Sequence, residues 1–151
     1  MYFYSYLVLV RMVLDDFSSK AAMEADGWTF NWNGKRSFVK GRRARARFCK
    51  DLPTSSYCGF RYPGDGLISY TFSNTGTATL EYGQSWRKGY IEVKKNNVVI
   101  DSRSTRGTST ITFDYSSGDI LAIEELDNSV INIHSLSFTS SSKAFLITLE
   151  F

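Results

Sequence analysis

The chain contains few of the residues on which most enzyme sites depend. Its 151 residues include one histidine, His134, and two cysteines, Cys49 and Cys58. A structural zinc site takes four ligands, most often cysteine and histidine, so clustered zinc chemistry is excluded. No glycine-rich phosphate loop precedes a helical pattern, and the Gly83–Arg87 segment lacks the second glycine of a nucleophile elbow. We therefore expect a protein that is not an enzyme, with His134 as an ordinary strand residue.

Acidic residues are missing from the segment Lys35–Lys50, although the chain as a whole has 15 acids. This segment holds eight of the 18 lysines and arginines, whereas the net charge of the whole chain is only +3. The positive charge is therefore local, and a local patch indicates binding or processing.

The chain also lacks an apolar run long enough to span a bilayer. The apolar N-terminal residues Met1–Leu14 are interrupted by Arg11, and they have neither a basic start nor a small-residue cleavage site. We expect a first strand over residues 7–14 and no membrane span. No N-x-Ser/Thr sequon occurs in the sequence, so glycosylation gives no indication of location.

Short alternating segments dominate the rest of the chain. From Leu67 to Phe138, strand-length apolar and polar alternation is broken by Gly, Asn, Asp and Ser at spacings of about 8 to 12 residues. Asn33-Gly34 and Asn96-Asn97 predict tight hairpins, and the serine-rich residues 137–143 read as a turn. We expect one all-β domain over residues 1–151, a two-sheet antiparallel β-sandwich of jelly-roll type. We predict about ten strands and at most one short helix, near Lys20–Ala25.

The segments SYTF, TATLEYG, ITFDYSSGDILAIEE and INIHSLSF, together with the opening VLDDFSS…DGW, resemble the galactose-binding-like and carbohydrate-binding jelly-roll modules. The resemblance implies a sugar site on loops at one end of the sandwich or on a concave face. It also implies, in many members, a structural calcium ion. Apart from such an ion, we expect no cofactor. Asp15, Asp16 and Glu125 are the acids that we consider as calcium ligands.

Aromatic residues near expected turns are the candidates for stacking on sugar rings, with polar donors fixing the hydroxyl groups. The candidates are Trp32, Tyr62 and Trp86, with Arg87 beside the last. Trp28 and Phe30 lie within an expected strand, and we expect them in the core.

Arginines alternate with alanines in the sequence GRRARARF, which places Arg43, Arg45 and Arg47 on one face of an extended chain. Three interpretations stay open. The arginines bind a polyanion through charge-assisted hydrogen bonds, they pair with acids of this chain or of a second subunit, or residues 42–45 form an R-x-x-R processing site. Nucleic acid is not favoured, because no recognition helix accompanies the patch.

Cys49 and Cys58 flank a loop-like segment, and we expect a disulfide between them in an oxidising compartment. The functional prediction is a non-catalytic, extracellular module that binds glycans, with an anionic polysaccharide as the more specific version. The alternative is a structural self-assembling protein, such as a matrix, filament or capsid-like subunit, whose edge strands pair with those of neighbouring copies.

Overall fold

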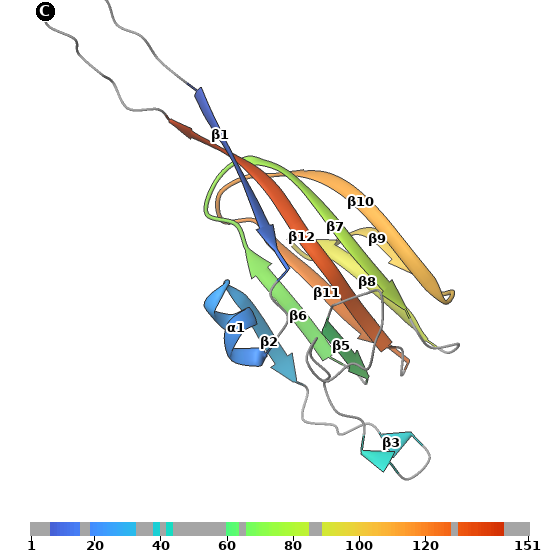
Figure 1. Ribbon diagram of the computed structural model, residues 1–151. Helices are drawn as coiled ribbons and strands as arrows, with labels where there is room; N and C mark the ends of the chain where they lie inside the picture. Colours follow the sequence, from blue (N-terminus) through green and yellow to red (C-terminus); the bar gives the residue numbers. More distant parts are fainter. Residues whose placement is uncertain are drawn as a thin grey trace, which may run out of the picture.

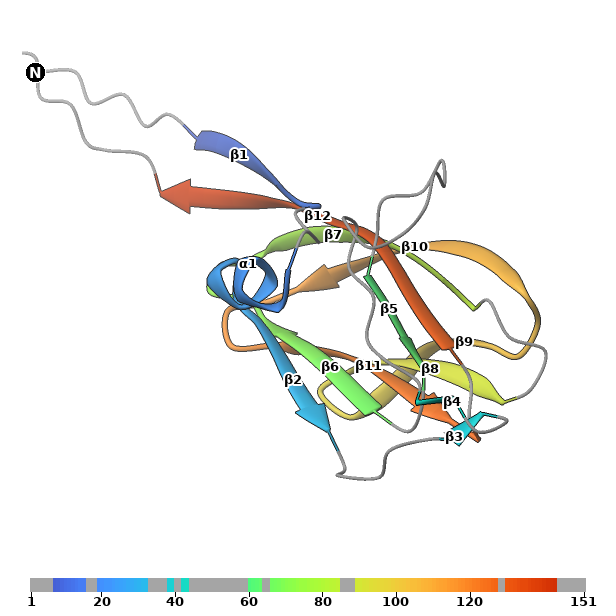
Figure 2. The ribbon, with the colours of Figure 1, turned by 60° about the horizontal axis from the view of Figure 1, so that its bottom comes forward.

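A computed structural model describes residues 7–15, 19–32, 38–39, 42–43, 60–63, 66–84, 89–127 and 130–143. These residues form two five-stranded antiparallel sheets and a separate two-stranded hairpin. The prediction of a two-sheet antiparallel β-sandwich of about ten strands is confirmed. Figure 2 shows the two sheets as two layers, with the helix α1 (Lys20–Ala25) beside one open side.

The first sheet has the order β1-β12-β7-β10, and β5 also pairs with β12. Its strands are β1 (Leu7–Leu14), β5 (Phe60–Pro63), β7 (Gly76–Gln84), β10 (Gly107–Tyr115) and β12 (Val130–Lys143). β12 is the longest strand, and its final residues pair with β1 alone, so that the two strands project together from the body of the sandwich (Figure 1).

The second sheet has the order β2-β6-β11-β8-β9. Its strands are β2 (Trp28–Trp32), β6 (Gly66–Thr71), β8 (Tyr90–Lys95), β9 (Val98–Arg103) and β11 (Ile120–Leu126). The separate hairpin consists of β3 (Phe38–Val39) and β4 (Arg42–Arg43). The expected hairpin at Asn96-Asn97 is confirmed, since both residues have positive φ between β8 and β9.

The serine-rich residues 137–143 do not form the turn that we expected. They continue β12, because Ser137–Lys143 pair residue by residue with Val13–Leu7 of β1. A long-range partner strand thus overrides the local preference of serine for turns. The helix prediction is confirmed: α1 begins after Ser19, whose side chain accepts a hydrogen bond from the amide of Ala22.

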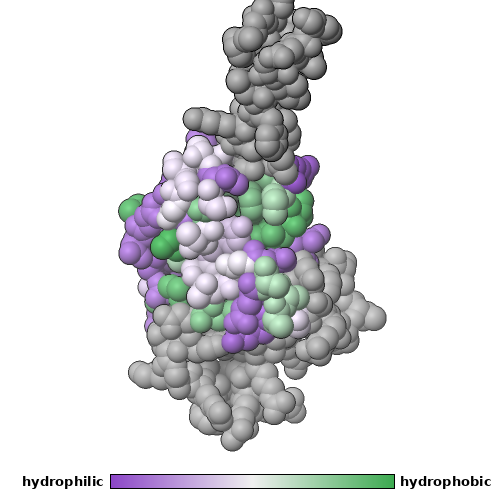
Figure 3. All heavy atoms as spheres, turned by 90° about the vertical axis from the view of Figure 1, so that its left-hand side faces the viewer, coloured by the Kyte–Doolittle hydropathy of each residue, from purple (hydrophilic) through white to green (hydrophobic). Residues whose placement is uncertain are grey.

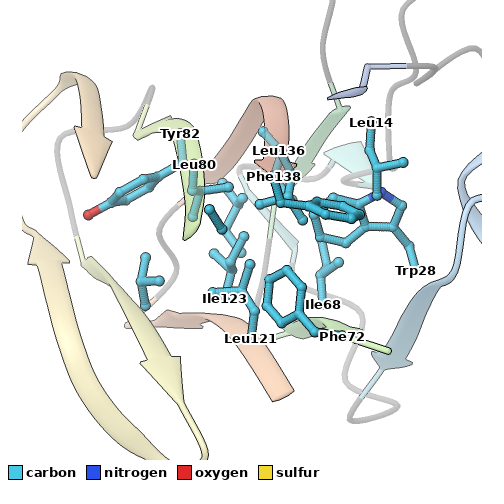
Figure 4. Packing of buried hydrophobic residues seen from close by; sticks show 14 of the residues in the cluster. Leu14, Trp28, Ile68, Phe72, Leu80, Tyr82, Leu121, Ile123, Leu136 and Phe138 are labelled. Atoms are coloured by element: carbon cyan, nitrogen blue, oxygen red, sulfur yellow. The ribbon is translucent and has the colours of Figure 1, made fainter. Parts of the chain in front are cut away.

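The core lies between the sheets and is built from alternate residues of the strands. Trp28 is buried, as expected, and Phe30 packs against the core cluster. An aromatic group joins the layers at the end near α1, where Phe72 stacks on Tyr115 with ring centroids 4.0 Å apart. Figure 4 shows Phe72, Phe138 and Trp28 packed at one side of the cluster, while the hydroxyl of Tyr82 points away from it at the other.

The described surface carries hydrophilic and hydrophobic residues side by side. On the side that carries α1, hydrophobic atoms form several separate groups among polar ones (Figure 3). No helix among the described residues has the length and hydropathy needed to cross a membrane.

Candidate functional site

One end of the sandwich collects several of the described residues that the sequence singled out. The register pairs Trp32 with Gly66, Gln84 with both Gly107 and Ile131, and Leu126 with Tyr90. Strands β2, β7, β9 and β11 therefore end here, and β6, β8, β10 and β12 begin here. We call this the loop end; it lies opposite the projecting ends of β1 and β12 (Figure 1).

Two of the three aromatic candidates lie at the loop end. Trp32 is the last residue of β2, and Tyr62 in β5 pairs with Ile131 at the start of β12. Trp86 and Arg87 lie outside the described residues, but the chain enters their segment from Gln84 and leaves it at Gly89. Two chain segments that are far apart in the sequence thus bring Trp32 and Tyr62 to one end of the sandwich, and the flanks of the segment that contains Trp86 lie at the same end.

The basic segment is described only in part. Arg43 lies in β4 and pairs with Phe38, and the β3/β4 hairpin lies toward the loop end in both ribbon views (Figures 1 and 2). Arg45 and Arg47 lie outside the described residues, as do Cys49 and Cys58. The polyanion site, the processing site at residues 42–45 and the disulfide therefore stay predictions.

Polar side chains occupy the space between the sheets at the loop end. The hydroxyl of Tyr82 in β7 donates a hydrogen bond of 2.6 Å to Oδ2 of Asp101 in β9. The guanidinium of Arg103 donates at 2.6 Å to Oγ of Ser109 and at 3.3 Å to the carbonyl oxygen of Arg106. Burial, followed by the hydrogen bond to Asp101, raises the pKa of the Tyr82 hydroxyl well above its ordinary value.

Gly107 makes room for this arrangement. A Cβ atom at Gly107 would lie 2.3 Å from Nη2 of Arg103, and the φ of +136° at Gly107 is one that other residues rarely adopt. Sequence reasoning missed the group formed by Tyr82, Asp101 and Arg103. Its signal was present, because Asp101 and Arg103 alternate in β9 on the face that the register assigns to the interior.

Two buried polar residues fix the backbone of the loop end. The side-chain amide of Gln84 donates at 3.0 Å to the carbonyl oxygen of Gly89, the first described residue after the Trp86 segment. Oε1 of Glu125 accepts a hydrogen bond of 2.6 Å from the amide of Ile131, which closes the connection from β11 to β12. Both side chains are only 1% exposed. They preorganise the strand ends from which the flanking segments leave.

The expected calcium ligands are not brought together by the described residues. Asp15 is exposed and follows Leu14, which pairs with Leu136 of β12, whereas Glu125 is buried beside Ile131. The five residue steps from Ile131 to Leu136 correspond to roughly 15 Å of strand, which no single ion can bridge. Asp16 lies outside the described residues, and within them no group of three or more candidate ligands occurs.

His134 lies in β12, as expected, at the irregularity where the register with β7 shifts between Ile133 and Ser135. Desolvation lowers the pKa of its imidazole, and the nearby carboxylate of Glu81 opposes that shift. The prediction that it is a strand residue is confirmed.

Comparisons with known proteins bear on the fold. No protein-family model and no curated protein sequence matches the chain. Among solved structures, a family 35 carbohydrate binding module from Clostridium thermocellum aligns with a TM-score of 0.50 at 11% identity, covering 87% of this chain and 99% of the module. A family two carbohydrate esterase from Cellvibrio japonicus aligns with a TM-score of 0.54 at 12% identity, covering 94% of this chain.

The chain spans 37% of the length of that esterase, but 99% of the length of the binding module. At these identities the likeness establishes the fold. The resemblance of the sequence to carbohydrate-binding jelly-roll modules is therefore confirmed as a resemblance in fold, and the ligand is a separate question.

Proposed function

We propose that the chain is a non-catalytic module that binds glycans at its loop end. The observation that carries the proposal is that Trp32 and Tyr62 lie at one end of the sandwich, where the chain also enters and leaves the segment that contains Trp86. Aromatic faces give a sugar ring its apolar contact, and neighbouring polar groups select the orientation of its hydroxyl groups.

The buried polar residues support a site that is formed before the ligand arrives. Gln84 binds Gly89 across the segment that contains Trp86, and Glu125 binds Ile131, the residue that pairs with Tyr62. A site built on restrained strand ends loses less conformational entropy when it binds. The two carboxylates at this end, Asp101 and Glu125, accept hydrogen bonds within the protein, which supports a structural role for them.

A glycan array probed with the purified chain tests this proposal. We expect binding to a defined glycan class, and the Trp32→Ala, Tyr62→Ala and Trp86→Ala variants should each weaken it about tenfold or more, as expected for loss of a stacking contact. Ile120→Ala is the matched control, because Ile120 is 45% exposed and pairs with Thr71 at the opposite end of the sandwich. Absence of any glycan signal, or equal binding by all four variants, would contradict the proposal.

The finer version of this proposal concerns charge. The eight basic residues of Lys35–Lys50 support an anionic polysaccharide as the ligand, in an extracellular protein where such polymers occur. Comparison of sulfated and unsulfated forms of one polysaccharide on the same array separates the two versions: a preference for the neutral form would exclude the anionic one.

Self-assembly is the second candidate function, and a specific observation favours it. Hydrophobic side chains are exposed on two edge strands, Met12 and Val13 in β1, and Val98, Val99 and Ile100 in β9. Exposed apolar edges are where strands of separate chains pair.

A further inference from the structure

Strand β1 forms one edge of the first sheet. Among the described residues it pairs with β12 and with no other strand. The backbone N–H and C=O groups on the side away from β12 therefore have no partner strand within the described residues. Met12 and Val13 in this strand are 44% and 47% exposed. Protein edges are commonly protected by proline or by several charged side chains, lysine above all, whereas β1 has no proline and no lysine, and Arg11 is its one charged residue.

The exposed part of β1, together with Asp15 directly after it, is self-complementary. Arg11 and Asp15 are both exposed, carry opposite charges and flank Val13 at equal distances along the chain. Neither takes part in an ion pair within the part of the chain that the structure describes. A strand with this pattern matches an antiparallel copy of itself, because reversal of the strand exchanges the positions of the two charges.

We propose that the free edge of β1 pairs with β1 of a second copy, antiparallel and with the two-fold axis at Val13. This register places Arg11 opposite Asp15 of the second copy, and Asp15 opposite its Arg11. Met12 then lies opposite Leu14, on the face of the sheet that Leu14 occupies in the core. The contact is isologous, as expected for a two-fold dimer.

Other registers are less favourable. When the register between the two copies of β1 changes, each residue must stay on its own face of the sheet, so the two-fold axis must pass through a residue. An axis at Arg11 would place two arginines directly opposite each other, which is destabilising. An axis at Met12 would place Arg11 opposite Val13 and separate it from Asp15. The axis at Val13 alone among these three forms two opposite-charge pairs.

The strength of the contact follows from its size. Five pairs of residues bury much less than the about 1,200 Å² of a standard protein interface, so we expect a reversible monomer–dimer equilibrium. This proposal does not depend on glycan binding, because the β1 edge and the loop end lie at different places in the fold.

A charge exchange tests the proposal by sedimentation equilibrium. Arg11→Asp and Asp15→Arg each create like-charge pairs and should raise the dimer dissociation constant about tenfold. The double variant Arg11→Asp/Asp15→Arg restores both pairs and should associate like the original chain. Arg106→Asp is the matched control for Arg11→Asp, since Arg106 is also exposed and the two replacements change the net charge by the same amount. Association that survives both single variants, or a chain that stays monomeric at millimolar concentration, would overturn the proposal.

Cross-linking provides an independent test of the register. Val13→Cys brings two cysteines directly opposite each other, with Cβ atoms about 5 Å apart, and should give a covalent dimer under mild oxidation. Met12→Cys faces Leu14 of the second copy and should not. The original chain, oxidised in parallel, measures the background from Cys49 and Cys58. Equal yields from the two variants would contradict the axis at Val13.

Discussion

The hydroxyl of Tyr82 and the carboxylate of Asp101 join the two sheets of the sandwich through a hydrogen bond of 2.6 Å. Tyr82 belongs to β7 of the first sheet, and Asp101 to the edge strand β9 of the second. The ring of Tyr82 is fully buried, so its hydroxyl has exchanged water for this one acceptor. The contact connects the apolar core to the polar group at the loop end.

Tyr82→Phe should lower the free energy of unfolding by about 1–2 kcal/mol. The substitution keeps the ring in the core but leaves Asp101 without the donor that satisfies it. Asp101→Asn retains an acceptor oxygen and should have a smaller effect. Urea denaturation followed by circular dichroism measures both values. A Tyr82→Phe variant as stable as the original chain would show that water replaces the hydroxyl without loss.

The same contact predicts a loss of stability at alkaline pH. Burial and the bond to Asp101 raise the pKa of Tyr82 above 10.0 in the folded chain, whereas the unfolded chain titrates near the ordinary value. Above about pH 10 the unfolded state therefore holds fewer protons than the folded state, and the free energy of unfolding falls by up to about 1.4 kcal/mol per pH unit. Burial raises the pKa of Tyr70 and Tyr115 as well, so they contribute in the same direction.

The comparison of the original chain with Tyr82→Phe isolates the contribution of Tyr82 to this loss of stability. The free energy of unfolding of the Tyr82→Phe variant should fall less steeply between pH 10 and pH 11, because the variant lacks one of the three tyrosines with a raised pKa. Parallel urea titrations at several pH values provide the slopes. Identical slopes for the two chains would contradict the assignment of the raised pKa to Tyr82.

Local sequence signals predicted the parts of the fold that depend on neighbouring residues. Ser19 before Lys20–Ala25 indicated the start of the helix, and Asn96-Asn97 indicated the β8/β9 hairpin, because each signal acts within a few residues. The alternation of apolar and polar residues over Leu67–Phe138 likewise predicted the strands, since its period shows which face of each strand is buried.

Contacts between distant residues could not be predicted in this way. Ser137–Lys143 have the composition of a turn, and only their pairing with β1 makes them a strand. Asp101 has the polarity of a solvated residue, and only the fold brings the hydroxyl of Tyr82 to it. The convergence of Trp32 and Tyr62 has the same origin, because it follows from the order of strands in two separate sheets. The aromatic candidates themselves were identifiable from the sequence, but their common location was not.

Gly76→Ala should destabilise the fold by about 3 kcal/mol or more. A Cβ atom at Gly76 would lie 1.7 Å from the carbonyl oxygen of Thr139 in the neighbouring strand. Backbone atoms cannot move aside as a flexible side chain can, so β7 and β12 would have to separate locally. Gly118→Ala is the control: its Cβ meets nothing within 4 Å, and only the strain of φ +89° should appear, at about 1–2 kcal/mol. Thermal unfolding shows which of the two variants is the less stable. A Gly76→Ala variant that is the more stable of the two would contradict the packing at Gly76.

The anionic version of the proposed function predicts a specific dependence on salt. Exposed charges are screened over about 10 Å at 0.1 M salt and about 3 Å at 1 M, so binding of a sulfated polysaccharide through arginines should weaken by an order of magnitude over that range. The triple variant Arg43→Ala, Arg45→Ala and Arg47→Ala should bind weakly at low salt and lose most of this dependence, while the affinity for neutral glycans stays unchanged. A control variant that replaces Lys20, Lys95 and Arg106 by alanine removes the same charge elsewhere on the chain and should keep the original salt dependence. Equal salt dependence of the two triple variants would show that net charge, and not the basic segment, attracts the polyanion.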